Sequence, residues 1–307
     1  MASHALDASK RSKGLPIVNV AMVPQRSPFR YPGGKTWLVP YIRLWLKQRL
    51  GPVRELIEPF AGGAIIGLTV AFEGLADSVT LVERDPDVAA VWKTILGGDG
   101  RWLADKVVDF DVTAESVRRV LDSTPRTTRD RAFQTLLRNR VQRGGILAPG
   151  AGLMKNGENG RGLKSRWYPA TLRKRMLAIG QMRHRIAFEE GDGLEVIRRN
   201  MQRQDAAFFI DPPYTVAGRR LYTYSEIDDE ELFSLAGRLA GDFLMTYNNA
   251  AEIRALAARH GFDVRLVPMK STHHAEMLEL LIGRDLNWVP VQGSAAVTAR
   301  QLTLQIE

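Results

Sequence analysis

The 307-residue sequence contains no cysteine. This absence excludes disulfides, cysteine-ligated zinc and a thiol nucleophile, and it fits the reducing cytoplasm in which we expect the protein. The chain also lacks an apolar run long enough to span a bilayer. Residues 1–14 are small, polar and basic and lack the apolar core of a signal peptide, so we expect residues 1–26 to form a disordered arm.

Acidic residues are in the minority. The 43 lysines and arginines outnumber the 34 aspartates and glutamates, which leaves a net charge of +9. The positive charge is unevenly distributed along the chain. This favours a polyanionic partner such as nucleic acid over the alternative that the charge only keeps the protein soluble. Two adjacent histidines, His273 and His274, are too close in sequence and too isolated to bind a metal, and we expect no metal site.

The stretch that organises the chain reads DAAFFIDPPY, over residues 205–214. Its apolar run predicts a buried strand, which the two prolines end because they lack N–H donors and have a fixed φ. Asp211, Pro212 and Tyr214 therefore follow the carboxyl end of a strand, where open α/β sheets bind ligands. The Asp211 carboxylate and the Pro212 carbonyl can accept both hydrogens of a planar amine, and the Tyr214 ring can stack on a base. The alternative is a plain turn after a core strand.

An earlier unit has the pattern of a strand, a glycine turn and a helix. The strand ends at Glu58, the turn is PFAGG and the helix is predicted over residues 64–73. Such a unit commonly holds a nucleotide-like cofactor, but the GxGxxG spacing is missing, which disfavours a nicotinamide oxidoreductase. The next strand ends at Glu83, about twenty positions after the turn, where an acid can hold a ribose diol.

A second glycine turn, PGGK, ends at Lys35 and precedes a helical pattern that shares a face from Trp37 to Leu46. The amides near Gly34 and the charge of Lys35 could hold an anion, although the spacing is not that of a phosphate-binding P-loop. Further strands are predicted over 186–189, 242–246, 262–267 and 277–282, with helices over 87–96, 228–239 and 250–260.

Residues 98–185 interrupt this alternation. They are predicted to be mainly helical to residue 140 and then to form a glycine-rich basic loop, which is typical of a surface that binds a phosphate backbone. The alternative is a disordered surface insertion. The predicted DNA contacts are Arg138, Arg140, Arg143, Lys155, Arg161, Lys164 and Arg166.

Taken in order, the motifs RYPGGK (30–35), EPFAGG (58–63), VE (82–83), GD (191–192) and DPPY (211–214) resemble those of the Dam-like family of DNA adenine-N6 methyltransferases. The resemblance runs over residues 29–282. It implies an α/β fold, a Rossmann-like S-adenosylmethionine-dependent methyltransferase sheet with helices on both faces. It also implies a catalytic domain over 27–97 and 186–290, a mainly helical DNA-recognition insertion over 98–185 and a C-terminal tail over 291–307.

The resemblance also implies roles for the matching residues. Asp211, Pro212 and Tyr214 match the catalytic turn, Glu83 the ribose-binding acid and Asp192 a residue near the cofactor adenine. The implied cofactor-binding residues are Tyr31, Gly34, Lys35, Glu58, Phe60, Gly62, Glu83, Asp192 and Asp211. The implied reaction is direct methyl transfer from S-adenosylmethionine to an adenine flipped out of double-stranded DNA.

Two departures from the family pattern limit what carries over. The glycine turn continues with Ala64 where many members have a third glycine, and the insertion lacks the pattern that reads GATC. Three alternatives stay open: methylation of cytosine N4, methylation of RNA adenine, and a non-catalytic subunit that binds DNA or the cofactor. The sequence also leaves open whether a cognate restriction endonuclease accompanies the protein in a restriction-modification system.

Overall fold

The computed structural model describes residues 22–30, 33–48, 53–157, 160–213, 227–270 and 276–290, with the backbone alone at 269–270 and 276–277. The predictions for Tyr31, Tyr214, His273 and His274 lie outside the described residues. Those for the C-terminal tail and for most of the N-terminal arm do so as well.

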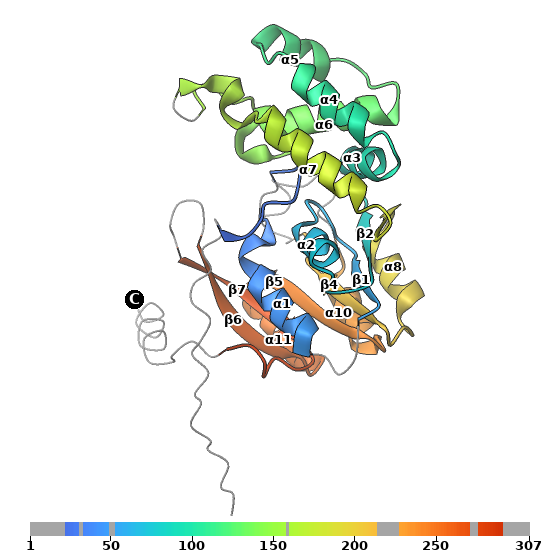
Figure 1. Cartoon of the computed structure of the whole chain (residues 1–307). Coiled ribbons are helices and arrows are strands. Elements are labelled where there is room, and N and C mark those ends of the chain that lie inside the picture. The colour runs from blue at the N-terminus through green and yellow to red at the C-terminus, as the bar shows by residue number, and fades with distance from the viewer. Residues whose placement is uncertain are drawn as a thin grey trace, which may run out of the picture.

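A mixed sheet forms the centre of the described structure, and the predicted α/β class is confirmed (Figure 1). Seven strands are described, in the order β3-β2-β1-β4-β5-β7-β6. Strands β1 to β5 are parallel, and β7 runs antiparallel to both of its neighbours. The bounds are β1 Glu55–Glu58, β2 Ser78–Glu83, β3 Ile186–Glu190, β4 Ala206–Ile210, β5 Asp242–Asn248, β6 Asp263–Lys270 and β7 Glu276–Gly283.

Helices cover both faces of this sheet. One face carries the short 3-10 helix η2 (Lys35–Leu38) and helices α1 (Val39–Gln48), α2 (Ile65–Glu73) and α3 (Pro86–Leu96), and the other carries α8 (Gly193–Asn200), α10 (Asp229–Arg238) and α11 (Ala251–Arg259). Side chains alternate along each strand, so Phe209 packs into the first core and Phe208 into the second. Both are fully buried, which explains why β4 reads as a continuous apolar run.

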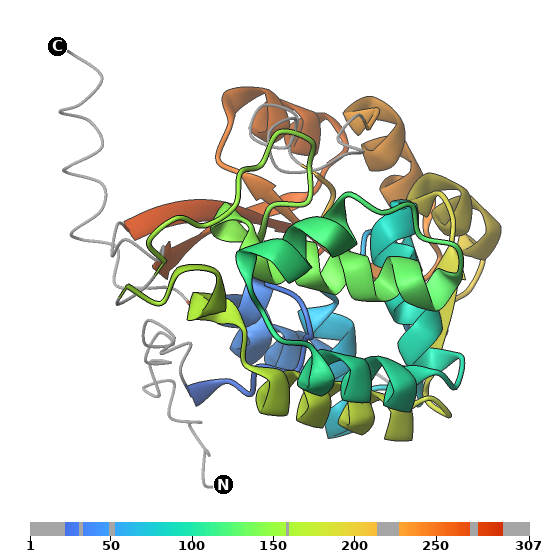
Figure 2. The same ribbon diagram turned by 90° about the horizontal axis from the view of Figure 1, so that it is seen from above.

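The segment between β2 and β3 is mainly helical, as the sequence predicts, and it lies over one end of the sheet (Figure 1), so it covers much of the sheet when seen from above (Figure 2). It contains α4 (Gly100–Asp109), α5 (Ala114–Leu121), α6 (Thr128–Val141), η3 (Arg143–Gly145), η5 (Gly162–Arg166) and α7 (Pro169–Gln181). Phe110 packs edge-on against Phe133 and Trp167, with ring centroids 5.2 and 6.0 Å away. Because Trp167 is buried, the end of the basic loop is anchored in the core of the insertion.

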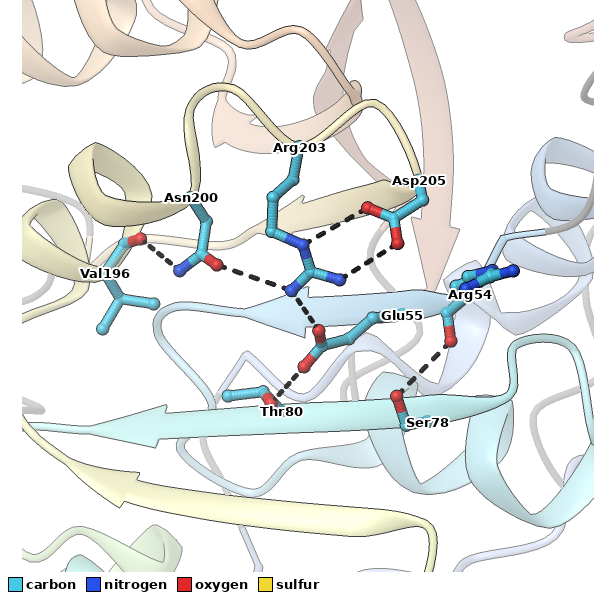
Figure 3. Close-up of polar contacts among 8 residues, drawn as sticks. All are labelled: Arg54, Glu55, Ser78, Thr80, Val196, Asn200, Arg203 and Asp205. Atoms are coloured by element: carbon cyan, nitrogen blue, oxygen red, sulfur yellow. Dashed lines mark hydrogen bonds and ion pairs between the residues drawn. The ribbon is translucent and has the colours of Figure 1, made fainter.

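Polar contacts fasten the amino-terminal end of the central strands (Figure 3). The Arg203 guanidinium bonds to Glu55 at the start of β1 and lies 3.3 Å from the Asp205 carboxylate before β4. Glu55 in turn accepts a hydrogen bond from Thr80 of β2. This network joins three neighbouring strands at one end and leaves the carboxyl end for the polar residues described next.

Candidate active site

The candidate site lies at the carboxyl end of the parallel strands. From β1 the chain continues outward to β2 and β3, whereas β4 and β5 lie on the other side of β1. The boundary between β1 and β4 is therefore the point where the direction of winding reverses, and open α/β sheets bind ligands outside such a point. Glu58 ends β1, Glu83 ends β2 and Asp211 follows β4 directly.

The glycine turn after β1 is fixed by its neighbours. Gly62 has a φ of 47°, a left-handed conformation that glycine adopts without strain. Its N–H donates to Glu83 Oε2 at 2.9 Å, and its carbonyl accepts the indole N–H of the buried Trp92 at 3.0 Å. The Ala61 N–H donates to the Val82 carbonyl at 2.9 Å. The turn is thereby held against the end of β2.

Glu58 is buried beneath this turn. Its Oε2 accepts the Gly67 N–H at 2.8 Å, and a Cβ at Gly67 would stand 2.5 Å from the same oxygen. Burial raises the pKa of Glu58 well above its ordinary value, and the nearby Asp211 raises it further. Glu58 is thus a buried acid close enough to Asp211 to be influenced by its charge, and the cofactor-binding role that the resemblance implies for Glu58 stays a prediction.

Glu83 is bound from both sides by backbone amides. Its Oε2 accepts from Gly62 and its Oε1 accepts from Asp85 at 2.8 Å. Burial raises the pKa of Glu83 to about 7, although the amide hydrogen bonds oppose this. The structure therefore holds the Glu83 carboxylate in one orientation at the glycine turn, and its ribose-binding role stays a prediction.

Asp192 caps the start of α8, after β3. Its Oδ1 accepts the Leu194 N–H at 2.8 Å, and its Oδ2 lies 3.3 Å from Arg84. The Phe60 ring approaches the same helix start, since a Cβ at Gly193 would stand 2.7 Å from a ring carbon. The structure thus places Phe60 and Asp192 near the same helix terminus.

The predicted catalytic aspartate is held by two elements far from it in sequence. Asp211 Oδ1 accepts the Thr246 hydroxyl hydrogen at 2.7 Å and lies 3.0 Å from Lys35 Nζ. Lys35 is only 4% exposed, and it also donates to the Gly33 carbonyl at 3.0 Å. Gly33 has a φ of 73°, which explains the glycine in the turn before Lys35. Gly34 is the next residue and lies directly before η2.

Sequence reasoning missed two members of this group, Thr246 and Glu279. Glu279 lies on β7 with its carboxylate 3.6 Å from Lys35 Nζ, and it is 6% exposed. Burial raises the pKa of Glu279 to about 7, while Lys35 lowers it and Asp211 raises it. The sequence did contain one indication of Glu279, since it is a single acid inside the apolar run MLELLI. An ionisable group in a buried strand needs a partner, so such an acid points to a second charged residue nearby.

The predicted DNA contacts occupy different environments. Arg138 is ion-paired with Asp87 at 3.0 Å and Lys164 with Asp111 at 3.2 Å. Arg140 is buried rather than exposed. The remaining members are Arg143, Lys155 and Arg161, which are exposed, and Arg166, which is half-buried.

Among the described residues, no three histidine, aspartate or glutamate side chains gather in a way that could bind a metal ion. Within the same ranges, every helix is too short or too polar to cross a membrane.

No family model matches the chain, and no curated protein matches it. Solved structures do match. The rRNA methyltransferase aviRa from Streptomyces viridochromogenes is 14% identical with a TM-score of 0.35, over 83% of this chain and 86% of that one. A precorrin-6y methyltransferase from Geobacter metallireducens is 11% identical with a TM-score of 0.35, over 79% and 85%. The B. subtilis tRNA methyltransferase TrmK is 10% identical with a TM-score of 0.33, over 85% and 72%. The substrates in these names belong to those proteins.

Proposed function

We propose that this chain is a methyltransferase that uses S-adenosylmethionine to methylate N6 of adenine in DNA. The observation that carries the proposal is the position of Asp211. Its carboxylate follows β4 at the switch point of the sheet and is held by Lys35 and Thr246. Pro212, the next residue, contributes an acceptor but no donor. A pair of adjacent acceptors suits an exocyclic amine better than a hydroxyl or a phosphate.

The residues around this position fit the cofactor. Glu83 presents a fixed acceptor next to the glycine turn, Asp211 and Glu279 both lie within 3.6 Å of the buried Lys35, and the buried Glu58 lies close to Asp211. A site with more acids than bases suits a cationic ligand. When bound, S-adenosylmethionine supplies a methyl group activated by a positively charged sulfur.

The role of Asp211 follows from its chemistry as an acceptor. It would accept one N6 hydrogen while the Pro212 carbonyl accepts the other, which orients the nitrogen lone pair for attack. The same carboxylate stabilises positive charge as it grows on nitrogen. The adenine must leave the duplex for this contact, because N6 is otherwise paired and stacked. Tyr214 would stack on the base.

The test is nucleoside mass spectrometry of unmethylated DNA after incubation with methyl-labelled S-adenosylmethionine. We expect labelled N6-methyladenine from the natural protein and near-complete loss of it for Asp211→Ala, with cofactor binding at least partly retained. Asp205→Ala is the matched control, because this exposed aspartate lies at the opposite end of β4 and should leave turnover intact. Unchanged turnover in Asp211→Ala would refute the role of Asp211.

The same measurement separates the alternatives. Cytosine N4 presents an amine of the same geometry, so labelled N4-methylcytosine would keep the mechanism and change the target. An RNA substrate assayed in parallel covers RNA adenine. Cofactor binding without transfer to DNA or RNA would indicate a non-catalytic or partner-dependent subunit.

A second readout tests the cofactor site apart from catalysis. Glu83→Gln removes the charge of the acceptor held by the Gly62 and Asp85 amides. We expect at least tenfold weaker S-adenosylmethionine binding by calorimetry. Glu189→Gln, on the neighbouring strand β3 and paired with Arg199, should bind as the natural protein does.

A further inference from the structure

Four arginines gather where the segment before Gly33 crosses the helical insertion. We call Arg30, Arg140, Arg166 and Arg175 the arginine cluster. Arg140 of α6 donates to the Pro28 carbonyl, and Arg175 of α7 donates to the Ser27 carbonyl at 2.9 Å. Arg166 belongs to η5. Hydrogen bonds of the cluster thus tie α6 and α7 to the stretch over residues 27–30, and Arg166 lies near enough to Arg30 and Arg140 for their charges to interact.

The side chain of Asn139 fixes this stretch in place. Its Oδ1 accepts the Arg30 N–H and its Nδ2 donates to the Arg30 carbonyl, both at 2.8 Å. A Cβ at Gly145 would stand 2.6 Å from the same carbonyl, so no larger residue fits there. The backbone that carries Arg30 is therefore positioned before any ligand binds.

The charges in the cluster repel each other. Burial, together with the charges of the nearby Arg175, Arg30 and Arg166, lowers the pKa of Arg140 to about 9. Burial also lowers the pKa of Arg30, with Arg166 contributing. The partly exposed Tyr168 opposes the shift at both Arg30 and Arg140. Like charges held together at a buried position are unfavourable unless a negative charge joins them.

Two donors in the cluster have no acceptor among the described residues. These are Arg140 Nε and Arg30 Nη1, both buried. The Arg140 side chain is 4% exposed, so this donor is a built feature of the interior. A buried N–H without an acceptor is costly, and a bound acceptor would remove that cost.

We propose that the arginine cluster binds a phosphoryl oxyanion, namely a phosphodiester of the substrate strand. This rests on the proposed function for the identity of the strand, but not for the anion site itself. Guanidinium groups bind phosphate oxygens through paired N–H donors, and their preference for this geometry exceeds that of lysine.

Two observations favour a phosphate within a strand over a free ion. Tyr168 next to the cluster is 40% exposed, one of the large side chains that stay open to solvent, and such a ring suits stacking on a base. Arg30 also precedes Lys35 by five residues, which limits their Cα atoms to about 18 Å apart. Because Lys35 contacts Asp211, a nucleic-acid strand bound at the cluster would lie only a short distance from the Asp211 site.

The first experiment uses inorganic sulfate as the probe. Thermal unfolding is followed as sulfate replaces chloride at constant ionic strength. We expect a saturating rise in Tm for the natural protein, superimposed on the general stabilisation that sulfate gives every protein. Arg30→Gln should lose the saturating part, and Arg126→Gln, an exposed arginine outside the cluster, should keep it. Arg140→Lys is the second variant, since lysine keeps the positive charge but lacks the paired, planar N–H donors of the guanidinium group.

The second experiment measures DNA affinity against salt concentration. Each phosphate contact contributes about 0.9 to the slope of log K against log salt. We expect the slope to fall by about that amount in Arg30→Gln and to stay unchanged in Arg126→Gln. No saturating sulfate effect, together with equal slopes in the two variants, would overturn the proposal. A saturating sulfate effect in a protein that binds no DNA would refute the proposed substrate and keep the anion site.

Discussion

Lys35 Nζ lies 3.0 Å from the Oδ1 of Asp211, at the carboxyl end of the sheet, and 3.6 Å from a carboxylate oxygen of Glu279. One buried cation thus stands between an acid of the DPPY turn and an acid of the last strand. Because both partners come from distant parts of the chain, this group links the DPPY turn to the antiparallel part of the sheet.

The first prediction concerns the cation itself. Lys35→Met leaves Asp211 and Glu279 close together without a positive charge. We expect a loss of about 3 kcal/mol in the free energy of unfolding, since breaking a buried ion pair leaves a charge uncompensated. Urea unfolding at neutral pH measures it. Lys47→Met, at an exposed lysine of α1, is the control, and an equal loss in both variants would show that Lys35 has no such role.

The second prediction concerns pH. Burial raises the pKa of Glu279 from 4.5 to about 7, so the folded state holds this proton more tightly than the unfolded state. The stability gained from the neutral form is complete below pH 4.5 and is lost as pH rises through about 7. Glu279→Gln imitates the neutral form. We therefore expect the free energy of unfolding to fall less in Glu279→Gln than in the natural protein as pH rises from 5 to 8. The difference between the two falls should be at most about 3 kcal/mol.

Urea unfolding at several pH values tests this expectation. Glu83 titrates in the same range, with a pKa of about 7, so part of the pH dependence should persist in Glu279→Gln. Glu115→Gln, at an exposed position of α5, should follow the natural protein throughout. Parallel curves for all three proteins would contradict the assignment to Glu279.

The strands could be predicted from the sequence because each is a short apolar run between turn residues. The prolines after Ile210 placed the end of β4 correctly, and the acids at Glu58 and Glu83 marked the ends of β1 and β2. The glycines of the first turns were equally informative, since Gly33 and Gly62 have a positive φ. The positions of these residues in the sequence were therefore enough to predict that they lie together at the carboxyl end of the strands.

The sequence did not reveal which distant residues complete the site. Nothing local shows that Glu279 reaches Lys35, because that contact depends on β7 lying beside β5. Nor did the basic run RNR show which arginine points inward. Charged side chains are mostly exposed, and the burial of Arg140 follows from the packing of α6 against the segment that carries Pro28.

The third prediction tests the contacts at the other end of the sheet (Figure 3). Arg203→Ala leaves Glu55 without the guanidinium that it contacts, although the Glu55 side chain is only 17% exposed. We expect a loss of about 1 kcal/mol in stability and no change in cofactor affinity. Arg198→Ala removes a more exposed ion pair with Glu231 and should cost less. A weaker affinity for S-adenosylmethionine in Arg203→Ala would show that this network supports the site.

The fourth prediction concerns Ala64, which precedes α2. Its φ of 50° and ψ of 33° are left-handed, and it is the one non-glycine residue with a positive φ among the described residues. An L-residue in this conformation costs about 1–2 kcal/mol. Ala64→Gly removes that strain. It also removes a buried methyl group, worth about 0.8 kcal/mol, and frees the unfolded chain by about 0.4–1 kcal/mol.

These contributions nearly cancel, so Ala64→Gly should change the free energy of unfolding by less than about 0.5 kcal/mol. Ala71→Gly is the matched control, because Ala71 is equally buried but lies inside α2. There the lost methyl group and the weaker helix propensity add to about 1.5–2 kcal/mol of destabilisation. Urea unfolding of both variants decides the matter. Equal losses would show that the turn accommodates Ala64 without strain.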